Sequence, residues 1–243
     1  LKEHEPALCR SFYERTGCPM HACYPLAKIL WLKRNRPELF VRTKYIGSIK
    51  DHLFHAFTGE FLIDRSTAST TALYNAHQLA WDAEILNFIG ITEEMLPPVI
   101  STTEARPLAA DAAERMHLTA GLPVVIGATD GVLVNVGIGA VSAGQLSATI
   151  GTSGAVRMLV GEPRTDEKMR TWCYNLVDGL WVAGGAINNG GMILRWMRDN
   201  ICHFSEAQME GLDVDAYDLM TMKASKVAAG SEGLILLPFF TGE

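Results

Sequence analysis

The segment GATDGVLVNVGIGAVSAGQLSATIGTSG, residues 127–154, carries the pattern that decides the interpretation of this chain. It consists almost entirely of glycine, small and apolar residues, and Asp130 is its single ionisable side chain. The β-branched run LPVVIGATD, residues 122–130, predicts a buried strand that ends near this aspartate. A carboxylate there would be partly desolvated, which suits a general base, although aspartate also commonly caps a turn.

The same segment ends in a tight turn, Gly151-Thr152-Ser153-Gly154. Consecutive backbone N–H groups in such a turn can converge on a phosphate, with the two hydroxyl groups as further donors, but the turn could also be an ordinary hairpin connection. A carboxylate and a donor turn together are typical of phosphoryl transfer. In that reaction the carboxylate accepts the proton of the attacking hydroxyl while the loop and Mg²⁺ hold the donor phosphates.

Two other nucleotide-binding motifs are excluded by the residues at their fixed positions. After Gly137-Ile138-Gly139, a dinucleotide fingerprint requires glycine at the position occupied by Ser142. A Walker A loop that begins at Gly139 requires lysine at the position occupied by Gln145.

The composition predicts a globular protein that does not bind nucleic acid. The chain has 243 residues, of which 48% are hydrophobic and 20% are charged, and its formal net charge is −6. The basic residues form no block, so the electrostatic footprint of a nucleic-acid-binding protein is missing.

The cysteines predict reduced thiols in a cytoplasmic protein. They are odd in number, lack the spacing of a disulfide framework, and follow no signal peptide. His21 lies between two of them, but the spacing is neither CxxC nor HxxxH, so we predict no metal ligands. The five cysteines are Cys9, Cys18, Cys23, Cys173 and Cys202.

Residues 121–141 form an apolar run about as long as a membrane span. Asp130 at its middle would cost about 3 kcal/mol in a bilayer, and Pro123 and the glycines weaken a helix. We therefore predict two short buried strands around a turn, and no membrane association.

Apolar residues at helical spacing predict helices between residues 25 and 57, interrupted at Pro37 and ended by Gly59. The second of these helices is expected to carry an apolar stripe of Ile46, Ile49, Leu53 and Phe57. The other elements predicted before residue 120 are a strand at residues 61–64 and helices near residues 81–88 and 107–118.

The second half of the chain is predicted to open with strands. A strand pair is joined at residues 151–154, and a hairpin over residues 171–186 turns at Asp178-Gly179. Asn188 or Asn189 can then cap a helix with Met192, Ile193, Trp196 and Met197 on one face. The change from helices to strands predicts two domains, residues 1–122 and 123–243.

Five motifs in order resemble the FGGY carbohydrate kinases, which phosphorylate sugars and polyols with MgATP. CYPLAKILWLKRN, residues 23–35, resembles the first family signature, and YIGSIKDHLFHAFTGEFLIDRSTAST resembles the segment after it. GATDG and IGTSG are similar to the start of the second domain and to its phosphate loop, and GLILLPFFTGE is similar to the run before the adenosine site. WVAGGAINNGGMILRWMRD looks like the gluconate kinase branch.

The resemblance implies an α/β chain of the actin-like, ribonuclease H-like ATPase fold, with two domains, mixed sheets and an interdomain cleft. It implies that Asp130 is the catalytic base and also contacts the substrate. Cys23 and Tyr24 would face the sugar, although cysteine is unusual at position 23 in the family. The resemblance further assigns the nucleotide contacts to Gly151, Thr152, Ser153, Gly190 and Gly191.

The implied reaction is phosphorylation of D-gluconate by ATP with Mg²⁺, giving 6-phosphogluconate. Another sugar or polyol kinase of the family, of xylulose, ribulose or glycerol type, is an alternative, and so is a truncated remnant without activity. We expect the chain to be roughly the middle half of such a kinase, because the first phosphate motif and the adenosine motif of the family are not in it. A homodimer is possible.

Several further polar residues have two interpretations. Arg15 and His21 could meet the carboxylate of a sugar acid or could be exposed loop residues. The residues Asp64, Ser66 and Ser69 match the family pattern and are interpreted as turn and packing residues.

Overall fold

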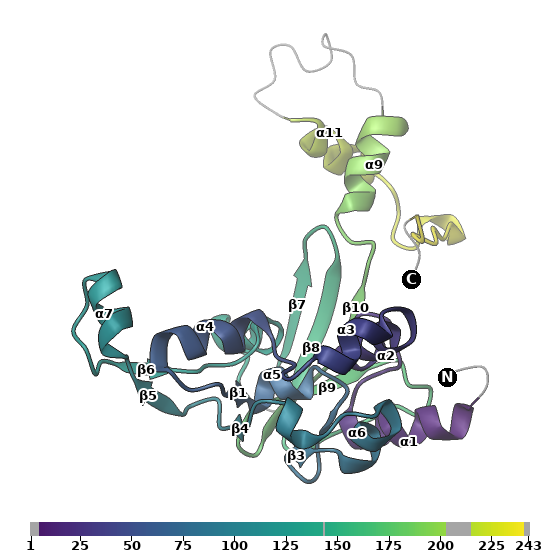
Figure 1. Ribbon diagram of the computed structural model, residues 1–243. Coiled ribbons are helices and arrows are strands. Elements are labelled where there is room, and N and C mark those ends of the chain that lie inside the picture. Colours follow the sequence, from purple (N-terminus) through teal and green to yellow (C-terminus); the bar gives the residue numbers. More distant parts are fainter. Residues whose placement is uncertain (1–4, 143, 203–214, 241–243) are drawn as a thin grey trace. The chain divides into compact units, whose positions relative to one another are not determined.

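The computed structural model describes residues 5–142, 144–202 and 215–240 (Figure 1). The chain divides into two compact units. The first comprises Leu1–Ser147 and Arg157–Gly185, and the second comprises Ala148–Val156 and Ala186–Glu243. The predicted division into domains at residues 122 and 123 stays a prediction.

The first unit begins with four helices, which confirms the helical pattern predicted between residues 25 and 57. Proline at the first helical position is pre-organised for a helix and starts three of them, and Gly59 ends the fourth in the left-handed conformation with φ 79°. The helices are α1 (Pro6–Thr16), α2 (Pro25–Asn35), α3 (Pro37–Arg42) and α4 (Ile49–Thr58).

The buried face of α4 differs from the predicted apolar stripe. Ile49 is 79% exposed and Leu53 is 49% exposed, whereas Phe54 and Asp51 are buried. A capping box explains why the helix begins where it does, because the Ser48 side chain accepts the Asp51 N–H and the Asp51 side chain accepts the Ser48 N–H. Of the predicted stripe, only Ile46 and Phe57 pack against buried clusters, and Ile46 precedes the helix.

The short strand predicted at residues 61–64 is confirmed as β1 (Ile63–Asp64), which pairs in parallel with β4 (Val99–Ile100). Helix α5 (Arg65–Ser69), which was not predicted, follows β1 directly. The unit continues with β2 (Tyr74–Asn75), β3 (Ala80–Trp81), α6 (Ala83–Ile89), the 3₁₀ helix η1 (Glu93–Met95), β5 (Ala105–Pro107), α7 (Ala110–Met116) and β6 (Pro123–Val125). Helices α6 and α7 confirm the predictions at residues 81–88 and 107–118.

The region after β6 contradicts the prediction of two short strands at residues 121–141. Strand β6 is short and largely exposed, and helix α8 (Asp130–Gly137) follows it. Only Val132 and Asn135 of this helix are buried. The apolar run is therefore a surface helix, and within the described residues no helix has the length and apolar character to cross a membrane.

A four-stranded sheet follows, in the order β7-β8-β10-β9 (Figure 1). Its strands are β7 (Leu146–Ile150), β8 (Gly154–Val160), β9 (Trp172–Val177) and β10 (Leu180–Ile187). Strands β9 and β10 are antiparallel and turn at Gly179, where φ is 75°. Both predicted strand pairs are thereby confirmed. In the second pair Gly179 supplies the positive φ and Asp178 does not, and the register shifts between Leu180 and Trp181, as in a hairpin turn followed by a bulge.

The main core of the first unit joins helices far apart in sequence. Phe12 of α1 and Phe88 of α6 meet edge to face with ring centroids 5.4 Å apart. Tyr74 and Trp81 of the β2–β3 ladder also pack edge to face, at 6.2 Å. A second cluster forms around Val132, with Leu159, Leu176 and Val182 from the sheet. This packing fixes the start of α8 against the sheet.

The described part of the second unit contains helices α9 (Met192–Asn200) and α11 (Ala216–Ala224) and the 3₁₀ helix η2 (Ser231–Gly233). Trp196 of α9 stacks on Phe240, with ring centroids 4.6 Å apart. Arg198 of the same helix lies over the ring of Tyr217. The aromatic face of α9 thus packs within its own unit.

Candidate functional site

Asp130 is the first residue of α8, and its side chain is exposed. The prediction that this carboxylate is partly desolvated is therefore wrong, because no buried strand leads into it. Nor does Asp130 cap the helix, since the N-cap is Thr129 and no side chain makes the capping bond. The carboxylate lies at a helix N-terminus, where the helix dipole favours its negative charge.

The start of α8 is held by the small helix α5. The Thr129 N–H donates to the hydroxyl of Ser66 at 3.3 Å, and the Thr129 hydroxyl donates to Asp130 Oδ1 at 3.3 Å. Ser66 is fully buried. The residue before the predicted base is thus fixed by a buried side chain, a role that the sequence reasoning missed. The polar, small-residue run RSTASTT at residues 65–71 was the available signal.

Helix α5 is itself fixed by side-chain hydrogen bonds. Asp64 is fully buried and caps α5, accepting the Thr67 N–H at 2.8 Å and the Thr67 hydroxyl at 2.7 Å. Lys50 approaches the same carboxylate at 2.5 Å. At the other end of α5, the Ser69 hydroxyl accepts the Asn175 N–H of β9 at 3.0 Å. The interpretation of these residues as turn and packing groups agrees with the contacts.

The turn at residues 151–153 is exposed and is held by backbone bonds within its unit. The Gly190 N–H donates to Thr152 O at 2.9 Å, and the Gly191 N–H donates to Gly151 O at 2.6 Å. The Gly151 N–H donates to Ser153 O at 2.8 Å. In the described structure, the N–H and hydroxyl groups of Thr152 and Ser153 donate no hydrogen bond, so these four donors are free to meet an anion.

The two glycines after β10 have a role that differs from the expected one. A Cβ at Gly190 would lie 2.5 Å from Ser153 O, and a Cβ at Gly191 would lie 2.8 Å from Gly151 O. Glycine is therefore required at both positions because the turn at residues 151–153 lies too close to leave room for a side chain. Because both N–H groups are already bonded to it, they are not the free donors that were expected for a phosphate. Nucleotide contact by Gly190 and Gly191 stays a prediction.

The N-terminus of α9 also differs from the prediction. Its N-cap is Gly191, without a capping side chain, so the proposed cap by Asn188 or Asn189 is wrong. Gly190 and Gly191 are bonded through their N–H groups to the turn at residues 151–153, and α9 begins directly after them, at Met192. The helix therefore begins after the two asparagines. Asn189 is buried and Asn188 is exposed.

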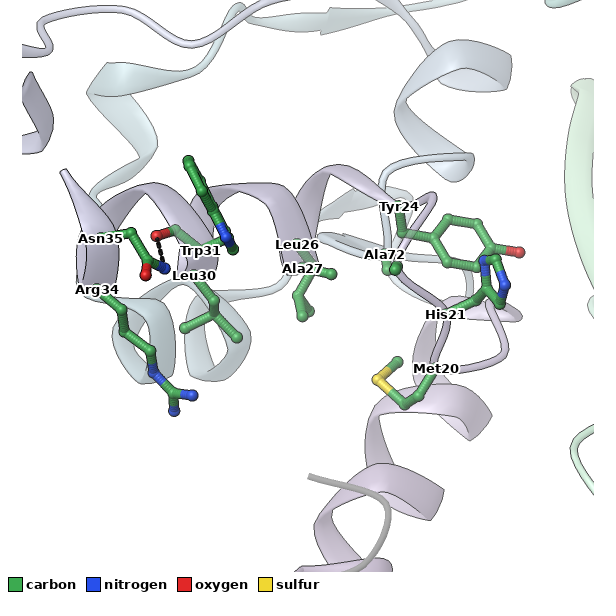
Figure 2. Close-up of a pocket in the computed structure, with 11 residues that line it drawn as sticks. Met20, His21, Tyr24, Leu26, Ala27, Leu30, Trp31, Arg34, Asn35 and Ala72 are labelled. Atoms are coloured by element: carbon green, nitrogen blue, oxygen red, sulfur yellow. Dashed lines mark hydrogen bonds between the residues drawn. The ribbon is translucent and has the colours of Figure 1, made fainter.

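The predicted sugar-facing residues lie beside a cavity of about 410 Å³ in the first unit. Figure 2 shows Tyr24 and His21 at one end of it and Trp31, Arg34 and Asn35 of α2 at the other. Most of the remaining lining is apolar, with Met20, Ala22, Leu26, Ala27, Leu30 and Ala72.

The loop that carries these residues presents one buried and two exposed side chains. Cys23 is exposed, and its N–H donates to Nδ1 of the exposed His21 at 3.1 Å. Tyr24 is 7% exposed, and its hydroxyl lies 2.7 Å from that of Tyr174, which stacks on Trp172. Burial raises the pKa of both tyrosines, so the pair stays neutral and hydrogen-bonded. The sugar contacts assigned to Cys23 and Tyr24 stay predictions.

The remaining candidates have structural partners. Arg15 approaches Asp82 at 3.2 Å and also pairs with Glu84, which ties α1 to the start of α6. Its Nη2 is buried and makes no hydrogen bond to the described residues. Burial raises the pKa of the Cys18 thiol to about 12 and that of Cys173 to about 11. These two thiols are therefore protonated and unreactive at neutral pH. In the described ranges, no three His, Cys, Asp or Glu side chains gather as a metal site.

The fold is that of sugar kinases of known structure. A ligand-bound xylulose kinase and a gluconate kinase, both from Lactobacillus acidophilus, each superimpose with a TM-score of 0.89 at 29% identity, over 100% of this chain and 48% of theirs. The predicted fold class, α/β with mixed sheets of the actin-like ATPase type, is thereby confirmed.

The chain belongs to the FGGY family of carbohydrate kinases, because the model of the family's N-terminal domain matches residues 2–137. It is 43% identical to a gluconokinase from Bacillus subtilis over 233 residues, which are 95% of this chain and 45% of that protein. An autoinducer-2 kinase from Klebsiella pneumoniae is 33% identical over 99% of this chain and 45% of its own length. The chain thus spans about half the length of the curated relatives it matches.

Proposed function

We propose that this chain forms part of an ATP-dependent kinase that phosphorylates the terminal hydroxyl of D-gluconate to give 6-phosphogluconate. The observation that carries the proposal is the 43% identity to a Bacillus subtilis gluconokinase along 95% of the chain. The gluconate kinase from Lactobacillus acidophilus, with its TM-score of 0.89, supports the same substrate class. ATP is a cytoplasmic metabolite, and a cytoplasmic location is part of the proposal.

In the proposed mechanism, Asp130 accepts the proton of the attacking hydroxyl as its oxygen bonds to the γ-phosphorus of ATP. The bond from that phosphorus to the β,γ-bridging oxygen breaks, and ADP leaves with the bond's electron pair. The exposure of Asp130 supports this role, since substrate must reach it. The exposed N–H and hydroxyl groups of Thr152 and Ser153 would donate to the ATP phosphates. Because catalysis of phosphoryl transfer is mostly positioning and charge stabilisation, these groups match what the reaction requires.

Magnesium is proposed to arrive with the ATP phosphates, whose charge it neutralises. The described residues offer no cluster of three His, Cys, Asp or Glu side chains to hold it. Residues outside this chain are proposed to complete the site, since the relatives are about twice as long.

A xylulose kinase is the second candidate, because the Lactobacillus acidophilus xylulose kinase matches with the same TM-score and identity as the gluconate kinase. A coupled assay of ADP release across gluconate, xylulose, ribulose and glycerol separates the two. The proposal expects gluconate to give the highest kcat/KM, and xylulose in first place would replace it. No turnover of any of these sugars would favour an inactive remnant.

The role of Asp130 is tested with Asp130→Asn in the active protein. Loss of the base is expected to lower kcat by about 10²–10⁴-fold while the KM for ATP changes little. The matched control is Asp111→Asn, because Asp111 is exposed on α7 and its carboxylate pairs, among the described residues, only with Arg115 four residues on. Activity of Asp130→Asn within a few-fold of the control would remove the assigned role.

A further inference from the structure

A small cavity lies in the first unit, between the beginning of α4 and helix α5. Its volume is about 140 Å³, which is large enough to hold a small hydrated or partly dehydrated ion. Apolar side chains such as Ile63, Leu73 and Trp81 form one part of its wall. The polar residues that line it are Ser48, Asp51, Thr67, Thr70 and Thr71.

Asp51 brings a buried and only half-satisfied carboxylate to this cavity. The side chain is fully buried, and Oδ2 accepts the Ser48 N–H at 2.6 Å. Oδ1 has no hydrogen-bond partner in the part of the chain that the structure describes. A buried carboxylate oxygen without a partner is strongly destabilising, so native proteins pair such atoms with a donor, a water molecule or a cation.

The threonine hydroxyls of the cavity cannot serve as that donor, because their protons are used elsewhere. Thr67 donates to Asp64 Oδ2 at 2.7 Å, Thr70 donates to Thr67 O at 2.8 Å, and Thr71 donates to Ala68 O at 2.6 Å. Each hydroxyl therefore has only lone pairs left to offer. One lone pair of Thr71 Oγ1 accepts the Leu73 N–H at 3.1 Å, and Thr67 Oγ1 lies 3.5 Å from Lys50 Nζ. The lining combines a carboxylate oxygen with hydroxyl oxygens that accept, which is the donor set that hard cations prefer.

The local charge balance favours a single positive charge. Asp64 and Lys50 are the charged groups whose fields act on Asp51. They neutralise each other, since the Lys50 ammonium lies 2.5 Å from Asp64 Oδ2. Asp51 is then left with one uncompensated negative charge. A monovalent ion balances it, whereas a divalent ion would be expected to need further carboxylates, and the described residues contain no such cluster.

We propose that this cavity binds a monovalent alkali cation, sodium or potassium, through Asp51 Oδ1 and the threonine oxygens. The ion would fasten α4 to α5, and α5 carries Ser66, which holds the residue before Asp130. The proposal does not depend on the identity of the sugar substrate.

The pH dependence of this site has a definite sign. Burial raises the pKa of the Asp51 carboxyl above its ordinary value of 3.8. Hydrogen bonds from the Ser48 backbone and side chain act against this rise, and the weaker effects of the charges of Asp64 and Lys50 raise and lower the pKa respectively. A raised carboxyl pKa gives stability that is present in acid and is lost as pH rises through the folded-state pKa. A cation competes with that proton, so its stabilising effect is expected at neutral pH and should disappear in acid.

The test is thermal unfolding of the purified protein at neutral pH in potassium, sodium or tetramethylammonium chloride at equal ionic strength. Tetramethylammonium is the control, because its methyl groups keep ligand oxygens away from its charge. Potassium or sodium at about 0.1 M is expected to raise Tm by about 2–4 °C over tetramethylammonium, and the rise should saturate with concentration. Equal Tm values in all three salts would overturn the proposal and leave a water molecule or a proton on Asp51 as the occupant.

Variants separate the site from general salt effects. Asp51→Asn is expected to remove the cation dependence while its amide oxygen can still accept the Ser48 N–H, and the exposed Asp111→Asn should keep the dependence. If Asp51→Asn does not fold, Thr70→Val against Thr70→Ser provides the second pair, because only the valine loses the hydroxyl oxygen. An anomalous signal from thallium(I) beside Asp51 Oδ1 in crystals would support the site, and a signal elsewhere would contradict it.

Discussion

Two regions hold the predicted reacting groups, and they do so by different physical means. In the first unit, α5 uses buried side chains, because Asp64 caps the helix and Ser66 accepts the Thr129 N–H beside Asp130. In the second unit, the turn at residues 151–153 is held almost entirely by main-chain atoms. Its carbonyl oxygens accept hydrogen bonds from the N–H groups of Gly190 and Gly191.

The difference determines what each region tolerates. A site organised by side chains depends on the chemical identity of a few polar residues, and removal of one leaves a buried partner unsatisfied. A site organised by the backbone depends on the absence of side chains, because the two segments approach too closely for a Cβ atom. Polar substitutions should therefore damage the first region, and small increases in size should damage the second.

The largest expected effect is that of Asp64→Ala in the side-chain region. The substitution removes a fully buried carboxylate that caps α5 and pairs with Lys50. We expect a loss of about 3 kcal/mol in the free energy of unfolding, at the lower end for broken buried pairs because Lys50 can still reach water. Urea denaturation measures it, with the exposed Asp111→Ala as the control near zero. A loss below about 1 kcal/mol would show that α5 does not depend on this carboxylate.

The second effect is that of Gly190→Ala in the backbone region. The added methyl group would lie 2.5 Å from Ser153 O, so the turn or the step into α9 must move. We expect a loss of about 1–3 kcal/mol in unfolding free energy, as for overpacking in a tight contact. In the active protein the KM for ATP should rise while the KM for the sugar does not. An unchanged KM for ATP would separate this step from the nucleotide site.

The sequence predicted much of this arrangement, and the parts that it missed have a common physical reason. Turn signals with fixed backbone requirements, such as Gly59 after α4 and Gly179 between β9 and β10, were interpreted correctly because positive φ is a local property. Helix α5 was missed because Ser and Thr favour local side-chain bonds, and only the tertiary partners of Asp64 and Ser69 make the segment helical.

The site residues show the same division. Asp130 and the turn at residues 151–153 were selected from residue type and glycine spacing alone. The exposure of Asp130 could not be predicted, because an apolar run of that length does not distinguish buried strands from an exposed helix. The engagement of the Gly190 and Gly191 N–H groups depends on a turn far away in sequence, which no local pattern reports.

A smaller effect is expected for Ser66→Ala, which removes one side-chain acceptor from the first region. The Thr129 N–H loses its partner, which should cost about 1 kcal/mol of stability. Because the next residue is Asp130, kcat is expected to fall several-fold while the KM for ATP stays constant. Ser101→Ala is the control, since the Ser101 hydroxyl hydrogen-bonds to Thr103 at the surface and to no other residue that the structure describes. A fall in stability without any change in kcat would limit Ser66 to a packing role.

The smallest effect is expected for Gly185→Ala. This variant tests whether the damage at Gly190 comes from the close backbone contact or from the loss of any glycine in this segment. Gly185 lies in β10, only a few residues before the step at Gly190, but a Cβ there would meet nothing within 4 Å and its φ is not positive. The alanine is expected to change the unfolding free energy by less than about 1 kcal/mol, with a slight gain from reduced freedom of the unfolded chain. The KM for ATP should stay at its original value. If Gly185→Ala instead matched Gly190→Ala in both measurements, the damage would come from stiffening of the strand end, and the close backbone contact at Gly190 would no longer explain why the turn needs glycine there.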